Sequence, residues 1–574
     1  MRFSGLRRSG ALSALLVLGP LAAQATIAPG SAAQIVSLQG NGEQHAQDSS
    51  QWLAAKPSQL LPGGAFVRTL PASKMALLFA DDTQIRLNQN SVLQVKSLAT
   101  AAQPTTLLLS IGRAWAQTKR DDGSRLNLET PAATAGIRGT DWELDVDATG
   151  KTLLTVLSGR VEFSNAQGAV TVNSNEAAIA EVGRIPVKIQ LSNPRDRIQW
   201  VNALTADPLR HLFADQVPPA LKPAHEALRK SDLSAAQAAL QAGAASAPGD
   251  WVAILRSAQA IQAGDTSVAR QTLENLVNAV QGVAPPAYLM LSDLQLVDGE
   301  FDMAANTLEA GLSRNPQDPE LLAQLARAYL LADRLFESAK TLARSRNADT
   351  ASVLVAEGDL ARRQGDASTT VEAYSLAKAV APGDDRGWFG LGSAQSEREE
   401  ISPARANLRQ ALALQPRGTG YAGELGTLET FANRFDAADA AFAAALERNP
   451  ADYVAWTGLG LSRLKQGQPK VALDAFLRAG VMEPRYARAK AYTAVAYYQL
   501  GRAGDAEDTL RQASALDDKD PVPYLLLSQI YTDQFRAGEA VQASREAVKR
   551  LPYLKSLNQL ASNQKGSANF GASL

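Results

Sequence analysis

Small residues recur along the second half of the chain at a nearly constant spacing. The intervals between them run from 32 to 35 residues and settle at 34 for the last five. The positions are Ala236, Ala269, Ala304, Ser338, Thr370, Ala404, Ala438, Ala472, Ala506 and Ala540. A single hydrophobic core requires no such period, whereas a stack of similar two-helix units does. The spacing therefore predicts an α-helical solenoid over more than half of the chain.

Length and composition limit what the rest of the chain can be. The 574 residues exceed what one hydrophobic core accommodates, so several domains or a repeat array are expected. A net charge of −1 does not indicate nucleic acid or an anionic membrane surface as the main partner. The absence of cysteine excludes disulfides, thiol catalysis and thiolate metal sites. We therefore expect no nucleic-acid partner and a fold held together by packing alone.

The N-terminus has the features of a secretory signal peptide. Arginines precede an apolar run over residues 11–23, which ends in an A-x-A motif at 23–25. The alternative, a transmembrane anchor, needs about 20 apolar residues, and Gly19 and Pro20 interrupt this run. We expect residues 1–25 to be a cleaved signal peptide. The mature protein is then periplasmic or outer-membrane-associated, without a transmembrane segment.

The front half of the chain alternates between apolar and polar residues with a period of two. Ile85 and Leu87 alternate with Gln84 and Arg86, and residues 142–147 show the same pattern. This period is typical of strands that are buried on one side and polar on the other. Turn-forming glycine, proline and aspartate residues separate the runs.

These short strands predict an all-β domain over residues 60–188, preceded by an N-terminal segment over 26–59. One run within the domain is more specific than the rest. It reads TPAATAGIRGT over residues 130–140 and is followed by the 142–147 strand and by VLSGRV over 156–161. This order closely resembles the FecR-like domain, whose signature is T-P-x-A-x-x-G-[VI]-R-G-T, a strand and a V-x-x-G-x-V turn.

The resemblance covers roughly residues 60–185. It implies a periplasmic all-β module with a solenoid-like sheet. The best-known members of the family relay signals from outer-membrane iron–siderophore receptors to sigma factors. This sequence lacks the cytoplasmic anti-sigma segment and the transmembrane helix of that branch, so we do not expect sigma-factor regulation.

We interpret the TPAATAGIRGT run as a mainly structural turn, with ligand contact by Arg138 as the alternative. Its defining residues are Thr130, Pro131, Gly136, Arg138, Gly139 and Thr140. The two glycines permit positive φ or a close backbone approach at a sharp turn between strands. Neither a following helix nor a suitably placed lysine is present, which excludes a phosphate-binding loop.

Residues 189–231 are predicted to be a helical linker, here called the connector. Pro194 stands at a helical start, and Pro218, Pro219 and Pro223 predict a stiff elbow before the first repeat.

The repeat units resemble the tetratricopeptide repeat. In residues 453–486 the signature W-x2-L-G, then G, A, F, A and P, is matched by Trp456, Leu459, Gly460, Gly467, Ala472, Phe476, Ala479 and Pro484. At this spacing the aromatic residues belong to the core and not to a cofactor site. The resemblance predicts about nine to ten units over residues 232–552, forming an all-α superhelix. Residues 553–574 are expected to form a capping helix and a flexible tail.

Tetratricopeptide geometry places the partner-facing residues on the first helix of each unit, along the concave groove. Extrapolated to this chain, these residues include Arg386, Phe389, Leu461, Leu464, Lys465, Arg488 and Tyr498. This mixture of apolar, aromatic and basic side chains suits an extended or helical peptide of a protein partner. The lysine and asparagine ladder of the carboxylate-clamp type is absent.

No pattern of catalytic residues accompanies these modules. His45, His211 and His225 lack a second ligand at metal-binding spacing. The aspartate pairs at 81–82 and 121–122 fall in expected turns, where aspartate serves turn geometry. We therefore predict a non-enzyme without cofactor or metal.

The sequence favours a periplasmic, envelope-associated scaffold or adaptor. Its repeat groove would bind protein partners, and its FecR-like domain would bind an outer-membrane or cell-wall component. The alternative is a signal-relay component that responds to outer-membrane transport receptors of the iron–siderophore type, without the cytoplasmic anti-sigma segment.

Overall fold

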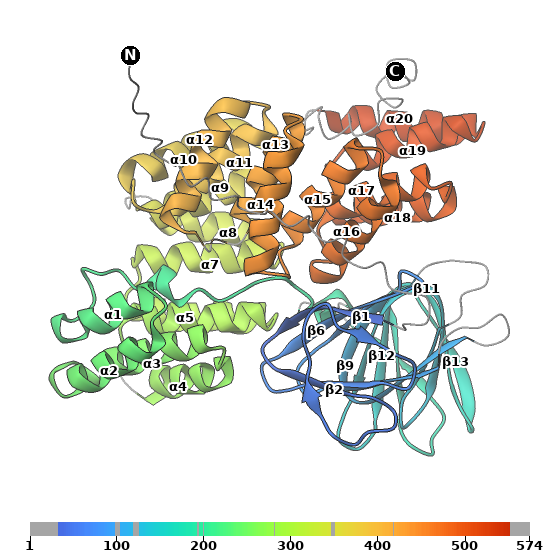
Figure 1. Ribbon diagram of the computed structural model, residues 1–574, viewed down its shortest axis with the longest axis horizontal. Coiled ribbons are helices and arrows are strands. Elements are labelled where there is room, and N and C mark those ends of the chain that lie inside the picture. The colour runs from blue at the N-terminus through green and yellow to red at the C-terminus, as the bar shows by residue number, and fades with distance from the viewer. Residues whose placement is uncertain are drawn as a thin grey trace, which may run out of the picture.

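The structure is a computed structural model that describes residues 33–97, 104–118, 126–191, 194–198, 200–279, 282–345, 350–416, 418 and 420–551. The expected signal peptide, the tail over 553–574 and the aspartate pair at 121–122 lie outside the described residues. The remainder forms an all-β domain followed by an all-α repeat array (Figure 1), which confirms the predicted fold class. No helix in the described part of the chain has both the length and the apolarity needed to cross a bilayer.

The β domain consists of one sheet around one core. Its strands are β1 (Ala33–Gln39), β2 (Gly42–His45), β3 (Leu53–Ala54), β4 (Leu60–Leu61), β5 (Phe66–Thr69), β6 (Lys74–Phe79), β7 (Gln84–Leu87), β8 (Val92–Ser97), β9 (Thr105–Gln117), β10 (Leu126–Glu129), β11 (Thr134–Val146), β12 (Thr152–Asn165), β13 (Gly168–Asn173), β14 (Glu176–Ala180) and β15 (Val187–Ile189).

The main path through the sheet runs β15-β14-β12-β11-β10-β9-β7-β6-β1-β4. Its pairs are antiparallel except β9–β10, which is parallel. The predicted alternation places Trp142, Leu144 and Val146 of β11 in the core. Glu143, on the opposite face, is also fully buried, because the connector covers that face.

The structure corrects the predicted start of the β domain. Strand β1, from the segment assigned to residues 26–59, lies between β4 and β6 in the sheet. Its Ala33 and Ile35 are fully buried in the same core as the rest of the domain. The described part of that segment is therefore an integral part of the β domain and not a separate unit.

The structure also corrects the predicted FecR-like turn. Gly136, Gly139 and Thr140 lie inside the continuous strand β11, where the register with β12 shifts between Arg138 and Trp142. Gly139 has φ +58° at this bulge, as its lack of a side chain permits. Opposite it, Gly159 has φ +84°, and a Cβ there would lie 2.5 Å from Thr140 Cγ2.

Only the beginning of the predicted run lies in a turn. Thr130 and Pro131 lie in the turn between β10 and β11, where Thr130 Oγ1 accepts a hydrogen bond from the Ala133 N–H over 3.1 Å. The run is thus a short turn followed by a bulged strand, because the bulge absorbs the extra residue without reversing the chain.

The connector is mostly irregular. It contains the short 3₁₀ helices η1 (Pro194–Ile198), η2 (Pro208–His211) and η3 (Pro219–Leu221). The helix that follows them already packs as the first helix of the array, so the array starts ten residues earlier than the predicted residue 232.

Twenty α-helices in the described residues form ten consecutive pairs, which matches the expected nine to ten units. The pairs are α1 (Lys222–Arg229) with α2 (Leu233–Gly243), α3 (Gly249–Ala263) with α4 (Thr266–Ala279), α5 (Pro285–Val297) with α6 (Phe301–Leu312), α7 (Pro319–Leu331) with α8 (Leu335–Leu342), α9 (Ala351–Gln364) with α10 (Ala367–Val380), α11 (Asp385–Glu397) with α12 (Ile401–Leu414), α13 (Tyr421–Phe431) with α14 (Phe435–Arg448), α15 (Tyr453–Lys465) with α16 (Pro469–Met482), α17 (Ala487–Gln499) with α18 (Ala503–Leu516), and α19 (Val522–Asp533) with α20 (Ala537–Arg550). Two further 3₁₀ helices, η4 (Ala244–Ser246) and η5 (Ala343–Ser345), follow α2 and α8.

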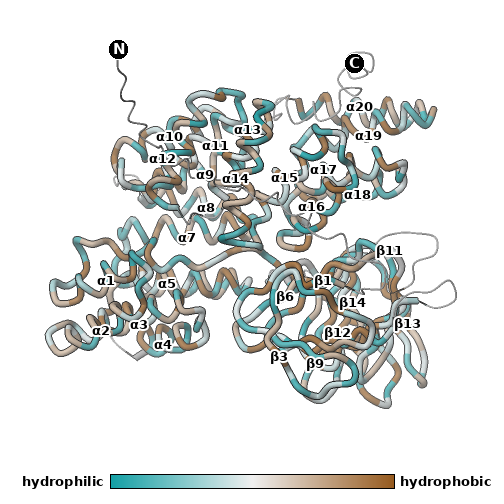
Figure 2. Tube along the Cα trace, viewed as in Figure 1, coloured by the Kyte–Doolittle hydropathy of each residue, from teal (hydrophilic) through white to brown (hydrophobic). Residues whose placement is uncertain are grey.

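The recurring small residues all lie in the second helix of a pair, and all ten are buried. They leave room for close packing of the paired helices. Apolar and polar residues are mixed over the array (Figure 2). In three units an aromatic ring of the second helix, that of Tyr374, Phe442 or Phe476, fills the remaining space, and most other units have a leucine at this position. At Gly460, for example, a Cβ would lie 2.4 Å from the Phe476 ring.

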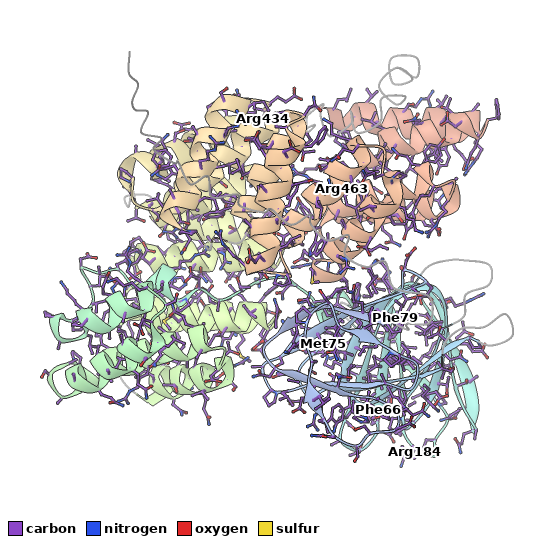
Figure 3. All side chains as sticks on the ribbon, viewed as in Figure 1. Phe66, Met75, Phe79, Arg184, Arg434 and Arg463 are labelled. Atoms are coloured by element: carbon purple, nitrogen blue, oxygen red, sulfur yellow. The ribbon has the colours of Figure 1, made fainter. Side chains whose placement is uncertain are left out.

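One face of the sheet packs against the second half of the array, with the connector between them (Figure 1). Arg86 of β7 donates to the Asn202 carbonyl at 2.6 Å and to the Met482 carbonyl at the end of α16. Arg478 of α16 donates to Gln34 Oε1 of β1 at 2.6 Å. Met75 and Phe79 mark this side of the domain in Figure 3, whereas Phe66 and Arg184 lie farther from the helices. The polar residues of this sheet face are therefore buried between the domains.

Candidate functional site

A pocket of about 210 Å³ opens on the concave side of the array. Its walls come mainly from α7, α9, α11 and α13, the first helices of four consecutive units. This groove pocket contains two of the predicted partner-facing residues, Arg386 and Phe389. The position agrees with the expectation that first helices line the groove.

The connector supplies one end of the groove pocket. Asp207 caps η2 by accepting a hydrogen bond from the Leu209 N–H at 3.1 Å, and η2 then places Arg210 and His211 at the pocket. His211 is buried and lies 2.8 Å from Asp293 of α5, measured from Nε2 to Oδ2. His211 thus anchors η2 to the groove wall.

Asp293 also accepts hydrogen bonds from Gln324 at 2.7 Å and from Arg327 at 3.0 Å, both on α7. Burial alone would raise the pKa of Asp293, but His211 and Arg327 together hold this pKa well below its usual range. The carboxylate stays charged and fully paired. It therefore joins the connector, α5 and α7 into one rigid wall.

Two further charged groups, the carboxylates of Asp359 and Glu397, line the deeper part of the groove. The Tyr374 hydroxyl donates to Asp359 at 2.5 Å, and burial raises the pKa of that carboxyl. Arg362 and Arg488, on α9 and α17, both bind Glu397 of α11, at 2.6 and 3.2 Å. A single carboxylate therefore bridges helices of three units.

The predicted residues Arg386 and Phe389 are held in place by neighbours. Arg386 pairs with Asp384 at 2.5 Å and donates to Ser352 at 2.9 Å. The Phe389 ring stacks on Tyr421 with 4.1 Å between centroids. A partner in the groove pocket would meet a pre-formed aromatic and polar surface, since these side chains are already ordered.

Beyond this pocket the groove is filled. Tyr486, Arg488 and Tyr492 surround a space of only about 10 Å³ next to Leu461. Leu461 and Leu464 are buried in the core, at 1% and 3% exposure, so they present no surface to a partner in this structure. The prediction of an open groove at these two positions is corrected, because large tyrosine side chains occupy the space that the repeat pattern left undefined.

Two more of the predicted partner-facing residues, Lys465 and Tyr498, line neither the groove pocket nor this smaller space. The Lys465 ammonium lies 6.0 Å from the centre of the Phe431 ring, and the Tyr498 hydroxyl donates to Asp533. The predicted set is thus divided. Arg386 and Phe389 share one pocket, and Leu461 and Arg488 lie farther along the groove.

Sequence reasoning missed the charged column formed by Asp293, Arg327 and Asp359. Each lies eleven residues before one of the recurring small residues, Ala304, Ser338 and Thr370. The column therefore occupies equivalent positions on three consecutive first helices. Aligning the repeats on their small residues would have revealed it.

The described residues contain no group of three or more His, Asp or Glu side chains placed to hold a metal. Asp81 accepts from the Thr83 N–H in its turn, and Asp82 pairs with Arg502 of the array at 3.0 Å. His45 stacks on Phe66, and His225 lies 3.0 Å from the Leu212 carbonyl. Each of these residues thus has a structural partner.

Comparisons with known proteins agree with this architecture. The family model described as "FecR protein" matches residues 65–162, and a tetratricopeptide repeat model matches residues 424–480 and 457–521. The chain therefore contains a FecR domain followed by tetratricopeptide repeats. This combination indicates a protein-interaction or signalling adaptor.

Curated relatives match only parts of the chain. Superkiller protein 3 of Schizosaccharomyces pombe is 33% identical over 107 residues, which cover 19% of this chain and 8% of that protein. The peroxisomal targeting signal receptor of Candida albicans is 25% identical over 224 residues, covering 39% and 34%. The chain thus matches about a third or less of the length of these two relatives.

Solved structures show partial likenesses. The APC/C hetero-tetramer Cut9–Hcn1 aligns with a TM-score of 0.45 and 16% identity, covering 66% of this chain and 69% of that one. A protein assigned as an anti-sigma factor from Parabacteroides distasonis aligns with a TM-score of 0.22 and 15% identity, covering 25% and 69%.

Proposed function

We propose that the protein is a periplasmic, envelope-associated adaptor, not an enzyme, and that its groove pocket holds an extended or helical segment of a protein partner. The observation that carries the proposal is the 210 Å³ opening on the concave face, walled by Arg386 and Phe389 and bounded by the connector. Pre-formed sites of this kind cost little side-chain ordering when a peptide binds.

The connector residue Arg210 belongs to the proposed site. Its guanidinium lies at the pocket with the groove residues, while the adjacent His211 is fixed to Asp293. A bound segment would therefore contact both the connector and the repeats. Loss of the His211 anchor is expected to weaken partner binding without unfolding the array.

The test places a photo-crosslinking phenylalanine analogue at position 389 of the full chain in its native host. The matched control carries the analogue at Phe336, which is 78% exposed on α8, away from the groove pocket. We expect a discrete crosslinked protein at position 389 that is absent at position 336. The crosslink should weaken when Arg386→Glu is added. The same products at both positions would contradict the proposal.

The periplasmic location is supported by the pattern of residues 1–25 and by the FecR domain. Fusing residues 1–40 to a phosphatase that is active only outside the cytoplasm tests this part separately. An inactive but stable fusion would contradict it.

A signal relay for a metal-transport receptor is the second candidate, and the FecR match favours it. The structure bears on how such a relay would work. The sheet face that carries Gln34 and Arg86 is bound to the array, so an envelope component would have to use another face of the domain. Deleting the gene should then change the expression of a transport operon, whereas the adaptor role predicts no such change.

A further inference from the structure

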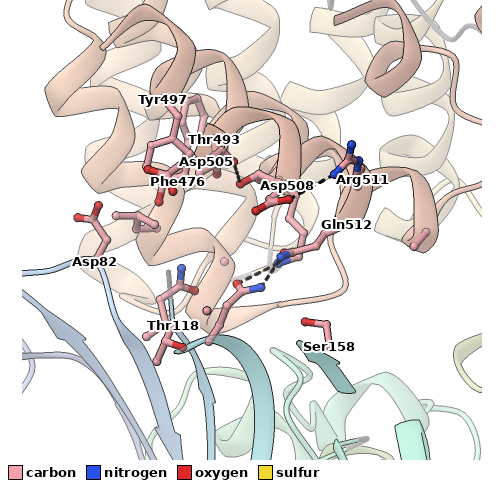
Figure 4. A pocket seen from close by; sticks show the side chains of 18 residues that line it. Asp82, Thr118, Ser158, Phe476, Thr493, Tyr497, Asp505, Asp508, Arg511 and Gln512 are labelled. Carbon is pink, nitrogen blue, oxygen red and sulfur yellow. Dashed lines mark hydrogen bonds and ion pairs between the residues drawn. The ribbon is translucent and has the colours of Figure 1, made fainter. Parts of the chain in front are cut away.

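A second cavity, larger than the groove pocket, lies between the β domain and the array (Figure 4). It has a volume of about 380 Å³, within the lower range of small-molecule sites at about 300–1,000 Å³. The sheet contributes Gln84, Gln117 and Ser158, and the helices contribute Lys490 of α17 and Gln512 of α18. We call it the interdomain cavity.

Lys490 is the most deeply buried charged residue of the interdomain cavity. Its side chain is 8% exposed, and its ammonium donates to Gln117 Oε1 at 3.1 Å and to Gln512 Oε1 at 3.5 Å. Within the described part of the chain, no carboxylate oxygen lies within 4.0 Å of this ammonium. Burial lowers the pKa of Lys490. The charge of Asp141 acts in the opposite direction on this pKa, but the hydrogen-bond partners of the ammonium are amide oxygens, and such a buried ammonium favours the approach of an anion.

The carboxamides around Lys490 leave donors available. Gln117 Nε2 donates to Gln512 Oε1 at 2.7 Å. The two N–H groups on Nε2 of Gln512 have no acceptor among the described residues. Gln84 is 6% exposed and its buried Oε1 has no hydrogen-bond partner there either. The cavity thus offers the unused N–H donors of Gln512 beside the Lys490 ammonium, together with one unused acceptor, Gln84 Oε1.

Acidic residues of the lining are already engaged elsewhere. Asp82 and Asp505 both bind Arg502, at 3.0 and 2.7 Å, and Asp508 lies 3.6 Å from Arg511, as the dashed lines of Figure 4 show for the last pair. Their charges are compensated by these arginines. They do not cancel the charge of Lys490.

We propose that the interdomain cavity binds a small molecule that carries a carboxylate. The carboxylate accepts hydrogen bonds from Lys490 and from the amide of Gln512, while Gln84 and Gln117 contact the same molecule from the β domain. A planar, two-oxygen acceptor can accept hydrogen bonds both from the ammonium of Lys490 and from the N–H groups of Gln512. Because both domains contact the ligand, binding stabilises the docked arrangement.

The test uses the purified full chain, with acetate, succinate and citrate as probes and succinamide as the uncharged counterpart of succinate. Binding is measured by calorimetry and by the shift in Tm at constant ionic strength. We expect at least one carboxylate to bind saturably and to raise Tm, with no effect of succinamide. Lys490→Met should weaken this binding at least ten-fold.

Lys465→Met is the matched control, because Lys465 lies on α15 outside the cavity lining. It should leave binding unchanged. Gln84→Leu reports on the contribution of the β domain and should weaken binding, and Gln512→Leu replaces Lys490→Met if that variant does not fold. The proposal is overturned if none of the carboxylates binds, if the folded Lys490 or Gln512 variant binds as tightly as the natural chain, or if inorganic phosphate binds more tightly than every carboxylate.

Discussion

Arg86 of β7 donates a hydrogen bond from Nη1 to the main-chain carbonyl of Met482, a residue 396 positions later that ends α16. Its other amino group binds the carbonyl of Asn202 in the connector. Carbonyls at a helix C-terminus lack intrahelical donors and carry partial negative charge, so a guanidinium suits them. One buried side chain thus joins the sheet, the connector and the array.

Replacing this side chain by Arg86→Met should weaken the docking of the two domains. The carbonyls of Asn202 and Met482 would lose a charged donor while staying buried, at a cost of about 2–4 kcal/mol in the free energy of unfolding. Urea denaturation followed by tryptophan fluorescence measures this loss. Limited proteolysis should show faster cleavage of the connector.

Arg68→Met is the control for this substitution. Arg68 pairs with Glu43 within the β domain, and its side chain is 35% exposed. An ion pair of that exposure contributes about 1 kcal/mol or less. Equal losses in the two variants would show that Arg86 has no special role in docking.

Lys74 makes the docking dependent on pH. Its ammonium donates to the carbonyls of Trp200 and Val297, and burial, aided by Arg86, lowers its pKa to about 7. The unfolded chain keeps the ordinary value of about 10.4 and binds more protons between these two values, so stability should rise with pH from about 7 to 10.

The measurement compares the natural chain with Lys74→Met by urea denaturation at several pH values in this window. The difference in unfolding free energy should change in favour of the natural chain by up to about 1.4 kcal/mol per pH unit. If the difference in unfolding free energy between the two chains does not change with pH, or changes in favour of Lys74→Met, the pH dependence does not come from Lys74.

Glu143 anchors the connector to the sheet. It is fully buried and lies 2.5 Å from Arg113 and 3.3 Å from Arg197 of η1. Glu143→Ala leaves both guanidinium groups without this partner and should cost about 3–5 kcal/mol. Glu129→Ala, which removes a half-exposed pair with Lys96, should cost about 1 kcal/mol or less, as thermal unfolding can show.

Gly460 sets the distance between α15 and α16. A Cβ at this position would lie 2.4 Å from the Phe476 ring, so Gly460→Ala should destabilise the array by about 1–3 kcal/mol. Gly504→Ala in α18 is the matched control, because a Cβ there meets nothing within 4 Å. The control should be neutral or stabilising by up to about 1 kcal/mol. Denaturation midpoints that rank the two variants in the reverse order would contradict the packing argument.

The groove shows how far the repeats alone predict where side chains lie. Arg386 and Phe389 line the groove pocket, as their positions on a first helix lead one to expect, and their contact with a partner stays a prediction. Leu461 and Leu464 obey the same register but are buried, because neighbouring tyrosine and core side chains fill the groove there. Which stretch of a groove stays open depends on side-chain volumes of adjacent units, and a period alone does not contain that information.

The sequence by itself determined the ten helix pairs and the FecR motif, because both depend on residues close together in the chain. Each helix pair contacts mainly its neighbours, so the 34-residue spacing of small residues is enough to define it. Only the tertiary structure decided how the two domains meet. Gln84 and Arg86 have the pattern of a solvent-facing strand side, yet α16 and the connector bury them. The carbonyls that Arg86 binds lie more than a hundred residues away, and alternation within a strand says that a face is polar, not what covers it.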